Sequence, residues 1–170
     1  MTHYASRRRS QFVSIKTILV PTDFSEHAKR AFERACELAV QLGAKLYLLH
    51  VQAESALRIA VKEGLFESCS TDEEIHSAVA ELIEQRFSQT LSGVDHSSIS
   101  IECTRRRGDP GAATIAYAQE IGADLVVVGR RGLGLIEEMR VAVIGSVTES
   151  LIRKSPCPVV VVRREHKAGR

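Results

Sequence analysis

The chain contains no tryptophan, and only 5 % of its residues are aromatic. Proteins that bind single-stranded nucleic acid use aromatic side chains as stacking platforms, so this class is not expected. The net charge is only +2, from 23 basic and 21 acidic residues, whereas nucleic-acid binders usually show a strong basic excess. No apolar run approaches the roughly 20 residues of a membrane-spanning helix, and no secretory leader is visible. We therefore expect neither a nucleic-acid partner nor a membrane.

Metal-binding and disulfide patterns are also lacking. The four cysteines, Cys36, Cys69, Cys103 and Cys157, lie far apart and form no C-x-x-C pair. This spacing argues against a disulfide framework and a zinc site. The six histidines show no metal-like spacing either. The cysteine pattern favours a reduced, cytoplasmic setting.

The length of 170 residues fits one domain with short tails. Residues 1–14 contain Arg7, Arg8 and Arg9 but no acid; Asp23 is the first acidic residue. Such a start is typical of an organellar leader and also of a solvated terminus, which is the interpretation we adopt. We predict a flexible basic tail over 1–14, a domain over 15–165 and a second tail over 166–170.

Apolar strand-like segments alternate with amphipathic segments of helical period along the domain. Pro21 is expected to end the first strand. Ser25 is a good N-cap, Gly43 is typical of a helix C-terminus, and Thr71 with Glu74 forms a capping box. We predict strands over 15–20, 44–51, 98–104, 124–128 and 159–162, and helices over 25–43, 71–92, 110–121 and 145–154. Residues 52–70 are expected to connect two elements, with at most a broken helical turn.

This alternation predicts an α/β domain with a doubly wound parallel sheet covered on both faces. Such sheets bind ligands beyond the carboxyl ends of their strands, where the strand order reverses. If the first strand is central, this point lies between the first and fourth strands. The loops Pro21-Thr22-Asp23 and Gly129-Arg130-Arg131-Gly132 would then face the same crevice.

The glycine-rich loop is a candidate phosphate site. Gly129 lacks a Cβ, so a phosphate could approach the backbone and a positive φ is accessible. Gly145 and Ser146 begin a helix whose first amides favour an anion, and Arg130 and Arg131 could offset phosphate charge. An ordinary turn followed by a helix start would explain the same residues. Neither a P-loop nor a dinucleotide-binding glycine motif is present.

Four segments resemble the universal stress protein family in type, order and spacing, over about residues 15–163. They are KTILVPTDFSEHAKRAF, LYLLHV, GDPGAATIAYAQEIGADLVVVGRRG and GSVTESLIRKSPCPVVVV. The resemblance implies a five-stranded parallel sheet of order 3-2-1-4-5, of the adenine nucleotide alpha hydrolase-like type. It also implies dimerisation and a role in stress response, with ATP binding in one branch of the family.

In that branch, G-x-x-G is followed after nine residues by G-[ST]. Gly129, Gly132, Gly145 and Ser146 match the motif, with Val147 next along the chain, but the gap here is twelve residues, 133–144. A lengthened helix could preserve both ends of the phosphate site, or the insertion could move Gly145 out of reach.

The resemblance places Pro21, Thr22 and Asp23 at the adenosine end of the site and Val51 against the adenine. Physically, the Asp23 carboxylate can accept from a hydroxyl or an amine, and Val51 offers an apolar face. Alternatively, Asp23 could simply stabilise a turn or cap beside Ser25, and Val51 could simply pack in the core.

No pair of nucleophile and base is evident, and His50 is expected to be a buried or edge histidine. Glu137 and Glu138 could hold Mg²⁺ or simply be solvated. We therefore expect an ATP- or AMP-binding stress-response regulator. The alternatives are a dimeric scaffold without nucleotide that regulates a protein partner, and a slow ATPase or autophosphorylating protein.

The last strand, Val159, Val160, Val161 and Val162, is expected at an edge of the sheet. An exposed apolar edge favours pairing with a second copy. We predict a homodimer in which these strands pair antiparallel about a two-fold axis.

Overall fold

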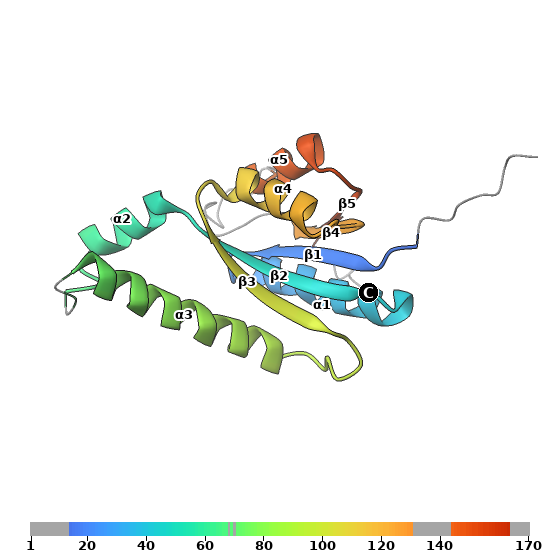
Figure 1. Cartoon of the computed structure of the whole chain (residues 1–170), viewed down its shortest axis with the longest axis horizontal. Coiled ribbons are helices and arrows are strands. Elements are labelled where there is room, and N and C mark those ends of the chain that lie inside the picture. Colours follow the sequence, from blue (N-terminus) through green and yellow to red (C-terminus); the bar gives the residue numbers. More distant parts are fainter. Residues whose placement is uncertain (1–13, 68, 70, 131–143, 164–170) are drawn as a thin grey trace, which may run out of the picture.

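The computed structural model describes residues 14–67, 69, 71–130 and 144–163. Five parallel strands form one sheet in the order β3-β2-β1-β4-β5, which confirms the expected doubly wound topology (Figure 1). The strands are β1 (Thr17–Thr22), β2 (Lys45–Gln52), β3 (Ile101–Arg107), β4 (Leu125–Gly129) and β5 (Val159–Val162). The helices are α1 (Glu26–Leu42), α2 (Glu54–Lys62), α3 (Asp72–Ser92), α4 (Pro110–Glu120) and α5 (Ser146–Lys154).

The helix ends follow local signals in the sequence. The Ser25 hydroxyl accepts a hydrogen bond from the Ala28 amide, and Gly43 ends α1 in the left-handed conformation at φ 60°. Both halves of the predicted capping box between Thr71 and Glu74 are formed at α3. These contacts are local in sequence, which is why they could be predicted.

Three elements differ from the prediction. Strand β1 does not stop at Pro21 but pairs with β2 as far as Thr22. Its pairing with β4 on the other side ends earlier, at Leu19. A proline therefore fits, because the strand has a ladder on one side only at that point. Residues 54–62 form a complete helix, α2, rather than a broken turn. Strand β3 begins at Ile101, opposite Leu46, instead of residue 98, and its pairing with β2 runs on to Arg107 instead of ending at residue 104.

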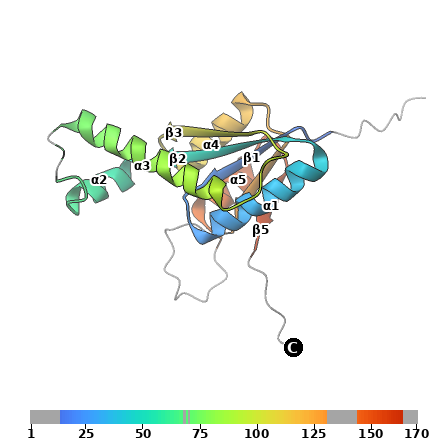
Figure 2. The same ribbon diagram turned by 90° about the horizontal axis from the view of Figure 1, so that it is seen from below.

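The core consists of two layers, one on each face of the sheet. Helices α1 and α3 cover one face with Phe32, Ile83 and Phe87. Helices α4 and α5 cover the other face with Tyr117 and Leu151 (Figure 2). Strand β4 is buried along its whole length between these layers, as its continuous valine run predicts.

Helix α2 and the start of α3 project beyond the end of the sheet (Figures 1 and 2). No residue of α2 is buried, and Ile59 and Leu65 have exposed fractions of 62 % and 72 %. No helix among the described residues has the length and apolar character required to cross a membrane.

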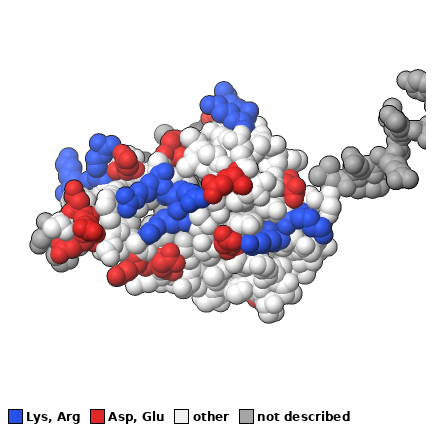
Figure 3. All heavy atoms as spheres, in the orientation of Figure 1, with Lys and Arg blue, Asp and Glu red and all other residues white. Residues whose placement is uncertain are grey.

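Basic and acidic side chains are interspersed on the face shown in Figure 3. Lys45 on β2 pairs with Glu102 on β3 at an N···O distance of 2.7 Å, and Arg106 on β3 pairs with Glu120 on α4 at 2.6 Å. Both are well exposed, so each contributes at most about 1 kcal/mol to stability.

Candidate functional site

A cleft of about 960 Å³ opens at the carboxyl ends of β1, β2 and β4. This is the crevice predicted from the strand-order reversal between β1 and β4. Eight of the predicted site residues line it: Pro21, Thr22, Asp23, Val51, Gly129, Gly145, Ser146 and Val147. Arg130 does not line the cleft. Arg131 and Gly132 lie outside the described residues, as does most of the twelve-residue gap 133–144.

The residues at the two ends of the lengthened loop, Arg130 and Gly145, meet at the end of β4. The Gly145 amide donates to the Arg130 carbonyl at 2.9 Å, and the Arg130 amide donates to the Val162 carbonyl at 3.1 Å. The buried Thr148 hydroxyl donates to the Gly129 carbonyl at 2.8 Å. The additional residues therefore do not separate the start of α5 from the end of β4.

Gly129 lines the cleft and is required for packing. A Cβ on Gly129 would lie 2.6 Å from the His27 carbonyl oxygen and 2.8 Å from the His27 carbonyl carbon, in the first turn of α1. Gly129 is also not among the described glycines with positive φ. A close approach between two backbones explains this glycine without reference to a phosphate.

Helix α5 begins at the cleft. Gly145 is the N-cap and offers no side-chain hydrogen bond. The first intrahelical bond runs from the Glu149 amide to the Gly145 carbonyl, so the amides of Ser146, Val147 and Thr148 precede it. These amides carry the positive end of the helix dipole, which favours an anion.

The loop after β1 is tightly organised by short-range hydrogen bonds. The Thr22 hydroxyl accepts from the Phe24 amide, and the Asp23 carboxylate accepts from the Ser25 amide, both at 3.0 Å. Phe24 adopts a positive φ of 62°, which costs a non-glycine residue about 1 kcal/mol. The turn role that we considered for Asp23 is therefore formed, and it fixes the position of this carboxylate at the cleft.

His50 links β2 to this loop and lines the cleft. Its Nδ1 donates to the Thr22 carbonyl at 2.9 Å, and its ring stacks on Phe24 with centroids 4.7 Å apart. Burial lowers the pKa of His50 below its usual 6.5; Arg105 adds to this, whereas the Thr22 carbonyl and Asp23 oppose it. A neutral, half-buried histidine agrees with the expectation from the sequence.

One wall of the cleft is not predicted from the sequence. The sequence predicts only a connection over residues 52–70, but helices α2 and α3 close the cleft beyond β2. Their apolar side chains there are Leu57, Val79, Leu82 and Ile83, and Phe66 joins them from the α2–α3 connection. The amphipathic spacing within 54–62 was the signal that could have indicated this wall.

Among the described residues, no group of three or more histidine, cysteine or acidic side chains is placed to hold a metal ion. Glu137 and Glu138 lie outside the described residues. The described part of the cleft thus offers backbone amides, the charged residues Asp23, Arg86 and Glu149 and an apolar wall, which suits binding of a ligand with a polar and an apolar part.

Strand β5 lies at an edge of the sheet, as predicted. The side chain of Val160 has an exposed fraction of 37 %. The position of β5 is compatible with pairing between copies, and the homodimer stays a prediction.

Comparison with known proteins agrees with this fold. The model of the universal stress protein family matches residues 14–163. A protein of Staphylococcus aureus strain USA300, named as a universal stress protein, is 32 % identical over 154 residues, covering 90 % of this chain and 87 % of that protein.

Two solved structures illustrate the likeness in three dimensions. The hypothetical protein MJ0577 superposes with a TM-score of 0.73 at 27 % identity, covering 91 % of this chain and all of that one. A universal stress protein solved in complex with cAMP superposes with a TM-score of 0.59 at 24 % identity, covering 89 % and 99 %. By its sequence over nearly the whole domain and by its sheet topology, the chain belongs to the universal stress protein family.

Proposed function

We propose that the protein binds an adenine nucleotide, ATP or AMP, in the cleft between β1 and β4 and acts as a nucleotide-dependent regulator in stress response. The observation that carries the proposal is the hydrogen bond from the Gly145 amide to the Arg130 carbonyl. It keeps the start of α5 next to β4 despite the insertion, so the amides of residues 146–148 lie at the same cleft as the Asp23 loop.

In this proposal the phosphates occupy the α5 end of the cleft. The helix amides and the exposed hydroxyl of Ser146 bind them, with Gly129, Gly132, Val147 and Arg131 around them. Any Mg²⁺ would be held chiefly by the phosphates, as is usual for this ion. The adenosine lies at the other end, with Pro21, Thr22, Asp23 and Val51.

The fold is compatible with such a ligand, since the neighbour solved with cAMP has the same architecture. At 24 % identity that likeness supports the fold alone. The assignment of a nucleotide to this chain therefore rests on its own residues.

The substitution Ser146→Asp tests the proposal. An acid in the first turn of a helix stabilises it by about 0.3–1 kcal/mol, but it places a negative charge where the phosphates are proposed to bind. We expect an unchanged or raised melting temperature together with at least a tenfold loss of ATP affinity in calorimetric titration. Ser146→Asn, which is close in size and uncharged, is the control and should retain binding.

Two results would overturn the proposal. One is that the purified protein releases no adenine nucleotide and gives no heat with ATP or AMP. The other is that Ser146→Asp binds ATP as tightly as the unmodified chain does.

We further propose that two copies pair through β5, residues Val159–Val162, as an antiparallel extension of the sheet. The edge position of β5 and the exposed Val160 support this pairing. Val160→Lys should shift the mass measured by light scattering from dimer to monomer, with little effect on the melting temperature of the monomer. A monomeric unmodified chain at micromolar concentration would contradict the pairing.

A further inference from the structure

Gln52, at the end of β2, is a buried polar residue that lines the cleft. Only 9 % of its surface is exposed. Its carboxamide makes no hydrogen bond to the other described residues, and its atoms are not fully enclosed, so the amide is open to the cleft. A carboxamide that is nearly enclosed by protein and open to the cleft is well suited to form hydrogen bonds with a ligand there.

The backbone of Gln52 is held firmly in place. It pairs with Arg107 as the last residue of the β2–β3 ladder, and its carbonyl accepts from the Gly108 amide at 3.1 Å. Helix α2 begins two residues later, at Glu54. The carboxamide therefore extends from a fixed point between two elements, so little conformational freedom remains to be lost when a ligand binds.

The surroundings of Gln52 suit a flat, largely apolar group. Alternation along β2 places Gln52 on the same face as His50, toward α1 and α3. Across the cleft stand Leu57 on α2 and Ile83 on α3, with Phe66 between these helices. An apolar slot with a few polar groups is the usual environment of a bound heteroaromatic ring.

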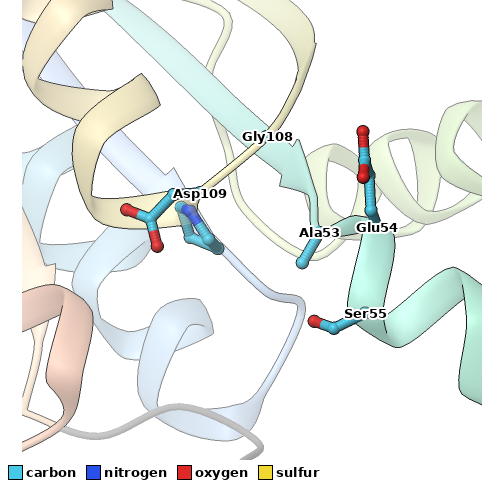
Figure 4. A pocket seen from close by; sticks show the side chains of 6 residues that line it. Ala53, Glu54, Ser55, Gly108 and Asp109 are labelled. Atoms are coloured by element: carbon cyan, nitrogen blue, oxygen red, sulfur yellow. The ribbon is translucent and has the colours of Figure 1, made fainter.

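The Asp109 carboxylate, near this end of the cleft, is already used within the protein. A smaller pocket of about 350 Å³ adjoins it between the start of α2 and the β3–α4 turn, and Figure 4 shows Ala53 and Ser55 facing this gap opposite Gly108. The Asp109 carboxylate there accepts from the Ala112 amide at 2.8 Å as the cap of α4. Gln52 is thus the buried side-chain amide available at the base end of the cleft.

We infer that Gln52 reads the base of the bound nucleotide through its carboxamide, an inference that rests on the proposed adenine-nucleotide function. Oε1 accepts from the exocyclic N6 amine of adenine, and the Nε2 amide donates to the adjacent ring nitrogen. A carboxamide presents one acceptor and one donor side by side, which matches this edge of adenine in two bonds. Because the amide can turn over to match guanine as well, the exocyclic amine is a better probe than GTP.

The experiment compares ATP with purine riboside triphosphate, which differs from ATP only in lacking the N6 amine. Both ligands are titrated calorimetrically into the unmodified chain and into Gln52→Met, in which an apolar side chain of similar length replaces the amide. Removing the amine leaves the buried Oε1 without a partner. We therefore expect about a tenfold loss of affinity in the unmodified chain, which corresponds to about 1.4 kcal/mol.

In Gln52→Met the two ligands should bind within about twofold of each other, because the group that distinguishes them is gone. Gln41→Met, a solvent-exposed glutamine on α1, is the matched control and should keep the tenfold preference. Equal preference for ATP in Gln52→Met and in the unmodified chain would overturn the role of Gln52 and leave nucleotide binding intact. Absence of binding by either ligand to the unmodified chain would overturn the proposed function and this inference with it.

Discussion

The substitution Gly129→Ala measures how closely β4 and α1 approach each other. The added Cβ would lie 2.6 Å from the His27 carbonyl oxygen and 2.8 Å from its carbon. Real Cβ atoms do not approach other heavy atoms so closely. Both contacted atoms belong to the backbone of the first turn of α1, so no side-chain rotation can relieve the overlap.

The expected cost follows from the rigidity of these two elements. Overpacking in a well-packed interior costs typically 1–3 kcal/mol, and we expect the upper end, about 3 kcal/mol, because α1 as a whole would have to shift. For a domain of this size, this corresponds to a fall in melting temperature of roughly 6–12 °C. Thermal and urea unfolding followed by circular dichroism would measure it.

Gly93→Ala is the matched control. Gly93 ends α3 at φ −82°, and its nearest neighbour to an added Cβ is the Thr90 carbonyl at 3.6 Å, an ordinary contact. Alanine there should be neutral or stabilising by up to about 1 kcal/mol. If Gly129→Ala melted within 2 degrees (roughly 0.5–1 kcal/mol) of the unmodified chain, the close packing of β4 on α1 would be refuted.

This result bears directly on tests of nucleotide binding. A larger residue at Gly129 would reduce ATP affinity through displacement of α1 even if no phosphate touched Gly129. The loss of binding in such a variant therefore does not identify a phosphate contact, and Ser146→Asp separates stability from binding more cleanly.

Three further substitutions test other parts of the structure. Thr148→Val removes the hydroxyl that donates to the Gly129 carbonyl, so urea unfolding should show a loss of about 1–2 kcal/mol, whereas Thr148→Ser should recover most of it. Thr71→Ala should cost about 1 kcal/mol and increase amide exchange in the first turn of α3, because the capping box is lost; unchanged exchange there would contradict the box. Because burial lowers the pKa of His50 from 6.5, the unfolded chain takes up this proton first as the pH falls. His50 therefore contributes fully to the free energy of unfolding above pH 6.5, and this contribution is lost as the pH falls through the lower pKa of the folded state. The substitution His50→Phe should flatten the dependence of this free energy on pH in that range. An unaltered slope would show that His50 does not titrate as described.

Much of the fold could be predicted because its signals are local. Ser25 and Gly43 bound α1 through contacts within one helical turn, and the valine run of β4 indicates a strand buried on both faces. The third strand was displaced in the prediction, because only pairing with β2 decides that it extends to Arg107. Helix α2 was missed because its nine residues, although amphipathic in spacing, stand within a longer segment of mixed polarity, residues 52–70.

The candidate site was predictable in its location and less so in its parts. The loop with Asp23 and the start of α5 were placed at one crevice by the rule for open parallel sheets, and eight of the predicted residues line that crevice. The role of Gly129 against His27, and the wall formed by α2 and α3, depend on distances between segments far apart in the sequence.

Apart from α2, the order of strands and helices was determined by the sequence itself, as were the caps and the buried valine strand. Each of these depends on neighbours a few residues away. Only the tertiary structure decided that the Gly145 amide reaches the Arg130 carbonyl across the insertion. It also decided that Gln52 lies in the cleft without a partner among the described residues. Those two features arise from the packing of α5 on β4 and of α3 beside β2, and no pattern along the chain specifies the gap that such packing leaves.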